Sequence, residues 1–236
     1  MEDTGEMSTD INELNNHAIQ AHFEGGVRNS LSERKIPFDH KIKERERTTI
    51  ITALELLPTE VTNHLMRVNL LPRGHASFAR FEELRGFGKG ILEVNRELFS
   101  IRERDVQLTI LHEVGGHGIL DGLHSLDQDL FGQIEDNWLQ IFEQYPELLS
   151  KDRNSGHELS CKDTGIGKLA LNQEEFIADR MAEYFAVKSG KFGEHQVHFL
   201  RKKDNPFTEE EETAVQSACE LTYAQFMTAT QLTPAA

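Results

Sequence analysis

Cysteine, positive charge and long apolar runs are scarce in this sequence, and each scarcity excludes a class of protein. Cys161 and Cys219 are the only cysteines in 236 residues, so no disulfide framework stabilises the fold, which indicates a reducing compartment. No apolar run is long enough to span a bilayer. The first ten residues are polar and acidic and lack the apolar core of a secretory signal. We expect a cytoplasmic protein without a membrane partner, although delivery into a host cell without a cleavable signal stays open.

The deficit of positive charge excludes a second class. Lys and Arg number 25 against 40 Asp and Glu, and the resulting net charge of −15 opposes binding to nucleic-acid phosphates. A hydrophobic content of 38% and a charged content of 28% are ordinary for a globular protein. The length suits one domain, or one domain with an appendage, and a short basic cluster at 201–203 is expected to be solvated. The oligomeric state stays open.

Hydrophobic periodicity and turn residues predict an α+β fold. Ser100 and Glu103 have the spacing of a helix capping box, as do Thr208 and Glu211. The glycines at 86–90 lack the spacing of a phosphate-binding loop and predict a hairpin turn. Strands are predicted at 67–71, 76–84 and 90–95, and helices at 8–24, 48–57 with a continuation at 61–66, 100–112, 126–145, 172–188 and 208–228.

The sequence HEVGGH at 112–117 contains two imidazoles and a carboxylate. A catalytic zinc needs about three protein ligands, an open position for water and a nearby base. On an ideal α-helix five residues advance about 500°, so the rings of His112 and His117 would point apart. A π-type bulge with one extra residue brings them together, and Gly115 and Gly116 lie where it is required, because glycine tolerates unusual backbone. The competing interpretation is a helix C-terminus, at which His112 caps carbonyl groups and the glycines end the helix.

A second segment, at 172–183, carries a carboxylate-rich helix face. Glu175, Asp179 and Glu183 are spaced at i, i+4 and i+8, and such like charges repel by roughly 0.2–0.5 kcal/mol per pair unless a positive group lies opposite. A metal ion held with the upstream histidines would supply that positive charge. The competing interpretation is a capping box from Asn172 to Glu175, in which Glu174 and Glu175 complement a helix N-terminus.

The two motifs in this order resemble the glutamate-type zincins with an expanded first motif, as in dipeptidyl-peptidase III. A fuller run, GILEVN at 90–95, HEVGGHG at 112–118 and EEFIADRMAE at 174–183, resembles more closely the zincin-like metallopeptidase domains of phage and mobile-element polyvalent proteins. The resemblance covers residues 65–190 and implies a zincin-like α+β fold, with a small mixed β-sheet packed on metal-bearing helices. The N-terminal fifty residues and the C-terminal forty lie outside the resemblance. From the sequence pattern we expect an N-terminal helix and charged arm at 1–47 and a C-terminal helical extension at 201–236, on either side of the zincin-like metallopeptidase domain at 48–200.

The resemblance also implies roles for particular residues. His112, His117 and Glu175 match the ligands of a Zn²⁺ ion, and Glu113 matches the general base that takes the proton of a water molecule. The carboxylates that orient the imidazoles match Glu174 and Asp179. The edge strand along which zincins bind an extended polypeptide substrate matches Gly90, Ile91, Leu92, Glu93 and Val94. The transition-state stabiliser has no clear match, and the candidates are Tyr184, His157, His195 and His198.

We therefore predict a zinc metallopeptidase that hydrolyses peptide bonds by metal-activated water, with Glu113 as the general base. Asp121 or His124 remain alternatives to Glu175 as the third ligand. The competing class is a non-catalytic interaction or inhibitor protein that keeps the scaffold with a structural zinc or none. Hydrolysis of a non-peptide amide would use the same residues. The substrate, and endo- versus exopeptidase action, stay open.

Overall fold

The computed structural model of the chain describes residues 36–72, 75, 77–84, 88–152, 166–193 and 205–232. The predicted glycine-rich turn is described only from Gly88, whose φ of 56° is left-handed, as expected of a turn glycine. Several predicted features lie outside the described residues: the helix at 8–24, the candidates His157, His195 and His198, and the basic cluster at 201–203.

A three-stranded mixed sheet and a larger set of helices make up the fold, as the sequence predicts. The strands are β1 (Leu65–Leu70), β2 (Ala79–Leu84) and β3 (Lys89–Val94). Their order is β1-β3-β2, with β3 parallel to β1 and antiparallel to β2. The prediction that residues 90–94 form an edge strand is therefore wrong, because β3 is paired on both sides. Among the described residues, β2 is the edge strand that contacts the helices carrying the metal motif.

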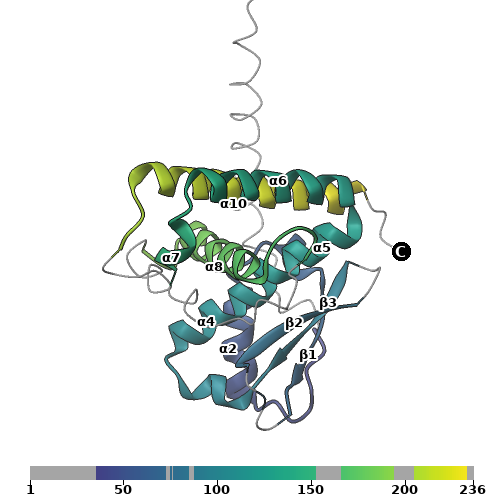
Figure 1. Cartoon of the computed structure of the whole chain (residues 1–236). Helices are drawn as coiled ribbons and strands as arrows, with labels where there is room; N and C mark the ends of the chain where they lie inside the picture. The colour runs from purple at the N-terminus through teal and green to yellow at the C-terminus, as the bar shows by residue number, and fades with distance from the viewer. Residues whose placement is uncertain are drawn as a thin grey trace, which may run out of the picture.

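The helices form two groups around the sheet (Figure 1). The helices α6 and α10 lie side by side across one end, with α8 beneath them, while α2 and α4 pack together next to the sheet. The helical bounds are α2 (Glu44–Leu54), α3 (Thr59–Thr62), η1 (Arg96–Ser100), α4 (Glu103–Ile110), η2 (Leu111–His117), α5 (Gly118–Leu126), α6 (Gln128–Gln144), α7 (Leu148–Lys151), α8 (Leu171–Lys188) and α10 (Glu209–Leu232).

The helix α8 runs through the centre of the molecule and is buried on all sides from Phe176 to Ala186. Its aromatic side chains pack against Trp138 of α6 and Tyr223 of α10. The indole N–H of Trp138 donates to Thr222 Oγ1 over 3.1 Å, which satisfies this buried donor between α6 and α10. The carboxylates of α8 are therefore held on a helix that is fixed by the core rather than on a mobile surface element.

Helix ends agree with the sequence prediction at some positions and differ at others. The capping box of Thr208 and Glu211 is confirmed, since each backbone N–H donates to the other's side chain. The Ser100 box is wrong, because Ser100 ends η1 and its hydroxyl donates to Glu97 O, while α4 begins at Glu103. The predicted helical continuation at 61–66 is also wrong beyond α3, because β1 already begins at Leu65.

No helix in the described part of the chain combines the length and the apolarity that crossing a bilayer requires.

Candidate metal centre

The helix that carries the first motif contains a π-helical turn. The α4 helix continues through η2 (Leu111–His117) directly into α5, with right-handed helical backbone at Ile110 and at Gly118. The π-type bulge predicted from the five-residue spacing is confirmed. Because hydrogen bonds in a π turn run from i to i+5, residues five apart become neighbours on one face, and the rings of His112 and His117 meet with centroids 4.8 Å apart. The competing interpretation, that the glycines end the helix, is wrong.

The two glycines of the π turn allow the close approach of neighbouring helices. A Cβ atom on Gly116 would lie 2.5 Å from Cα and 2.6 Å from Cβ of Ala178 on α8, and one on Gly115 would lie 2.9 Å from Leu57 and 3.0 Å from Phe185. Neither glycine has a positive φ. The sequence argument located the bulge, but these glycines serve packing rather than unusual backbone.

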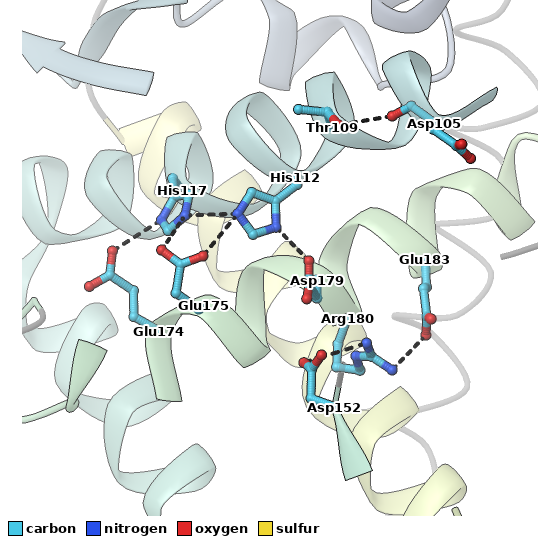
Figure 2. A network of polar contacts seen from close by, with 10 residues as sticks. All are labelled: Asp105, Thr109, His112, His117, Asp152, Glu174, Glu175, Asp179, Arg180 and Glu183. Carbon is cyan, nitrogen blue, oxygen red and sulfur yellow. Dashed lines mark hydrogen bonds and ion pairs between the residues drawn. The ribbon is translucent and has the colours of Figure 1, made fainter. Parts of the chain in front are cut away.

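Three side chains from two helices converge on one point (Figure 2). Nε2 of His112 and Nε2 of His117 lie 3.1 Å apart. Glu175, from the first half of α8, places its two carboxylate oxygens 3.3 Å from the first nitrogen and 3.4 Å from the second. Within the described residues these three form a group whose ligand atoms all lie within 4.8 Å of one another. The structure thus brings together the three residues that the sequence analysis selected as ligands.

The other nitrogen of each imidazole is held by a second carboxylate of α8. His112 Nδ1 donates to Asp179 Oδ1 over 2.7 Å, and His117 Nδ1 donates to Glu174 Oε1 over 3.0 Å. Since an ionised carboxylate can only accept, each Nδ1 carries a proton, and each Nε2 is the ring nitrogen that faces the other imidazole and Glu175. Glu174 and Asp179 of the acidic face of α8 therefore point toward the two histidines. They orient both rings from beneath, as Figure 2 shows.

The capping alternative for the second motif does not hold. The helix begins at Leu171, and the N–H of Ala170 donates to Gln173 Oε1 over 2.9 Å. Gln173 therefore supplies the reciprocal contact at this N-terminus. Glu175 is free of a capping role and instead faces the two histidines.

The electrostatics of the group favour a positive charge at its centre. Burial alone would lower the pKa of His112, but Asp179 and Glu175 outweigh it and raise that pKa to about 10. Burial also opposes charge on His117, yet Glu174 and Glu175 raise its pKa well above the usual range. For Glu175, burial raises the pKa, but contacts with both histidines outweigh it and hold that pKa far below the usual range. The carboxylates outnumber the imidazoles and attract a cation.

The donor set fits a zinc ion. With Zn–N and Zn–O bonds of about 2.0–2.1 Å, neighbouring ligand atoms of a tetrahedral site lie about 3.3 Å apart. The two Nε2 atoms lie 3.1 Å apart and are 3.3 and 3.4 Å from the two different oxygens of Glu175, distances close to that value. Two imidazoles and one carboxylate are a typical set for a zinc site that keeps a fourth position for water. The Glu175 side chain is 32% exposed, whereas both histidine side chains are 13% exposed, so the site opens on the Glu175 side.

Glu113 follows His112 in the π turn and is held by the edge strand β2. Its carboxylate Oε2 accepts from the backbone N–H of Phe81 over 2.9 Å, and it is close enough to His117 to raise the pKa of that imidazole. The Phe81 ring fits a slot made by two glycines: a Cβ atom on Gly90 would overlap the ring, and one on Gly118 would lie 3.4 Å from it. The fit of Phe81 in this slot therefore sets the distance between β2 and the π turn.

The remaining candidates lie elsewhere. Asp121 and His124 are not in the metal-ligand group of the described residues, and His124 packs edge-on against Phe131. Burial raises the pKa of Asp121 to about 7 against the attraction of His117, which places its carboxyl near the site but not among the ligands.

Tyr184 follows Glu175 by nine residues, about 900° on a helix, and so lies on the opposite side of α8. Its ring contacts Tyr223 of α10, which excludes it as the transition-state stabiliser.

Sequence reasoning missed the groups that act through the backbone. The N–H of Phe81 and the N–H of Ile166 contact Glu113 and Glu174, and a backbone donor has no signature in residue type. The one available signal is indirect. Glycine at position 90, within a predicted strand, indicates close approach of another chain segment.

Comparison of the chain with protein-family models, with curated proteins and with solved structures gives no match.

Proposed function

We propose that the protein is a zinc-dependent hydrolase of peptide bonds with a zincin-like arrangement of its metal-bearing helices. The observation that carries this proposal is the convergence of His112 Nε2, His117 Nε2 and the Glu175 carboxylate at tetrahedral ligand separations, with both Nδ1 atoms held by carboxylates. With each Nδ1 held by a carboxylate, each Nε2 is the nitrogen that can bind a metal ion after losing its proton, and the two Nε2 atoms lie side by side. Hydrolysis of the amide of a polypeptide is the reaction that best uses such a site together with an adjacent carboxylate.

A zinc ion bound there supplies Lewis-acid polarisation of the scissile carbonyl and lowers the pKa of a water molecule. The chain's own residues supply the remaining chemistry. Glu113 takes the proton of that water at its carboxylate, holds it, and delivers it to the leaving amine. Asp179 and Glu174 keep the imidazoles in one tautomer and one orientation. The Phe81 N–H holds Glu113 in place before substrate arrives.

The edge strand β2 supports a binding mode for an extended polypeptide. The Phe81 N–H is directed away from β3 and toward Glu113, so the outer edge of β2 borders the metal centre. Extended peptides bind exposed strand edges through backbone hydrogen bonds. The resemblance of the motifs to zincins agrees with such a strand, although it lies at 79–84 rather than at 90–94.

The deciding experiment compares three variants in zinc binding and in cleavage of a peptide library. Glu113→Gln is expected to keep zinc and to lose about 10²- to 10⁴-fold in turnover, the contribution of a general base. His112→Ala is expected to lose both zinc and turnover. Glu103→Gln, an exposed carboxylate in the first turn of α4, is the control and should behave like the wild type. Normal cleavage by Glu113→Gln would refute the mechanism, and bound zinc without turnover on any peptide would favour the interaction protein or a non-peptide amide substrate.

A further inference from the structure

One buried carboxylate outside both motifs contacts a turn of the chain, and the same turn also contacts the candidate metal centre. Glu135 lies on α6 and is only 4% exposed. Its Oε1 accepts from the backbone N–H of Lys168, and its Oε2 lies 3.4 Å from the ammonium group of the same residue. A carboxylate this buried on the inner face of an otherwise apolar helix surface is costly unless its partners are fixed.

The turn at 166–168 is shaped to meet that carboxylate. Gly167 has a φ of 61°, in the left-handed region, and a Cβ atom at this position would overlap Glu135 Oε1 and lie 2.8 Å from the Phe131 ring. The turn is closed by the N–H of Leu169, which donates to Ile166 O over 3.1 Å. Only glycine combines this backbone with this contact, so Gly167 and Glu135 form one fitted unit.

The other side of the same turn touches the metal centre. The N–H of Ile166 donates to Glu174 Oε2 over 3.1 Å, while Oε1 of the same carboxylate accepts from His117 Nδ1 over 3.0 Å. Both oxygens of Glu174 are thereby occupied, one by the turn and one by the histidine. The side chain of Glu174 is 13% exposed, so water does not readily replace either contact.

We propose that Glu135 is a positioning residue for the zinc ligand His117, acting through the turn at 166–168 and through Glu174. This inference rests on the proposed zinc site. Without the Glu135 acceptor the Lys168 N–H loses its partner, the turn moves away from α6, and Glu174 loses the donor that fixes one of its oxygens. The His117 ring then loses its fixed orientation, and zinc binds less tightly.

The test measures zinc affinity of the full chain by competition with a chromogenic chelator, and the absorption spectrum of the cobalt-substituted protein. Glu135→Leu is expected to weaken zinc binding about tenfold, the lower end of the effect of carboxylates that support metal ligands, and to change the cobalt spectrum. Glu135→Gln keeps an acceptor at the same place and should restore wild-type affinity. The matched control is Asp136→Leu, because Asp136 is 59% exposed and contacts the ammonium group of Lys168, at 2.8 Å, rather than the backbone of the turn.

The outcomes separate this inference from the proposed function. Unchanged affinity and spectrum in Glu135→Leu, or an equal loss in Asp136→Leu, overturns the inference. If Glu135→Leu does not fold, Gly167→Ala displaces the same turn and is expected to weaken zinc binding; wild-type affinity there overturns the inference as well. Wild-type protein that binds zinc but cleaves nothing refutes only the proposed hydrolase, whereas wild-type protein that binds no zinc refutes both.

Discussion

The backbone N–H of Phe81 donates to Oε2 of Glu113 across 2.9 Å, which joins the edge of the sheet to the carboxylate next to His112. A strand and a helical turn whose contacting residues are 32 positions apart in the chain are thus registered by one hydrogen bond. The registration depends on the slot between Gly90 and Gly118 that receives the Phe81 ring. The position of Glu113, the proposed base, therefore depends on how Phe81 of β2 packs against Gly90 of β3 and Gly118 of α5.

A methyl group in that slot is expected to misplace the base without touching the metal ligands. In Gly90→Ala the new Cβ would overlap the Phe81 ring and lie 2.9 Å from Glu82 O, so β2 must move outward and its N–H must leave Glu113. We expect turnover to fall about tenfold, a part of the contribution of a general base, with zinc affinity unchanged. Peptide cleavage, chelator competition and amide exchange of Phe81 measure these three quantities.

The control for that variant is Gly118→Ala, whose Cβ would lie 3.4 Å from Phe81 and 3.6 Å from Glu113 O, ordinary contact distances. In this variant, turnover and the slow amide exchange of Phe81 should both stay as in the wild type. Equal loss in both variants would show that β2 is not registered by the slot.

A second prediction concerns the crossing of the π turn and α8. Gly116→Ala would place a Cβ 2.5 Å from the backbone of Ala178, and overpacking of this kind typically costs about 1–3 kcal/mol of stability. Because the displaced helix carries Glu175, zinc binding should weaken as well. Denaturant unfolding in the presence of a chelator gives the stability of the metal-free protein.

The chain offers a matched control for this substitution. Gly132 lies inside α6, and a Cβ there would meet nothing within 4 Å. Gly132→Ala is therefore expected to stabilise the protein by about 0.5–1 kcal/mol through helix propensity alone. If Gly116→Ala also stabilised the protein, the close approach to α8 would not be a constraint.

The three candidate metal ligands could be predicted from the sequence because residues that share a helix face recur at fixed spacings along the chain. Two histidines five positions apart share one face of a helix when the helix contains a π turn, and the structure contains one at Leu111–His117. The carboxylates of α8 follow the same logic, since positions 175 and 179 are one helical turn apart. Local periodicity also located the three strands, because the alternation of apolar and polar residues is visible within each segment.

Long-range relationships escaped the sequence analysis for a physical reason. Which strand is central depends on pairing between segments, and residues 90–94 have the same pattern whether β3 lies inside the sheet or at its edge. The predicted cap at Ser100 was wrong because its hydroxyl donates to Glu97 O, three residues earlier, instead of accepting from the N–H of Glu103. The contact of Glu135 with the turn at Gly167 joins segments about thirty residues apart, within the ordinary range of nonlocal contacts, through a backbone N–H.

A third prediction concerns a buried ion pair on the far side of α8. Lys151 Nζ lies 2.6 and 2.8 Å from the two oxygens of Glu211, and both residues are buried. Lys151→Met would leave the carboxylate buried without its cation, which costs about 3–5 kcal/mol near pH 7. The control Lys188→Met breaks the more exposed pair with Glu220, 3.4 Å long, and should cost about 1 kcal/mol or less.

The cost of Lys151→Met should depend on pH. Burial raises the pKa of Glu211, but the Lys151 ammonium and the Thr208 contacts outweigh it and hold that pKa below its usual range. A depressed carboxyl pKa gives stability that is present above the pKa of the unfolded chain and is lost as the pH falls through the folded value. The difference in unfolding free energy between wild type and Lys151→Met should therefore shrink between pH 7 and pH 3. A difference that stayed constant would mean that lost packing, not charge, explains the effect.

The last prediction concerns the protons that zinc displaces. In the metal-free protein, Asp179 and Glu175 outweigh the effect of burial and raise the pKa of His112 to about 10, so this imidazole carries an extra proton at pH 7. Zinc requires the unprotonated Nε2 and must release that proton, so affinity should rise by about tenfold per pH unit for each proton released. Titration calorimetry in two buffers of different ionisation enthalpy counts the protons.

Asp179→Asn removes the first cause of the raised pKa and should reduce both the proton release and the pH dependence, whereas Asp136→Asn, on the surface of α6, should change neither. Zinc binding that released no proton at pH 7 would show that the two histidines do not take part as ligands in the arrangement described.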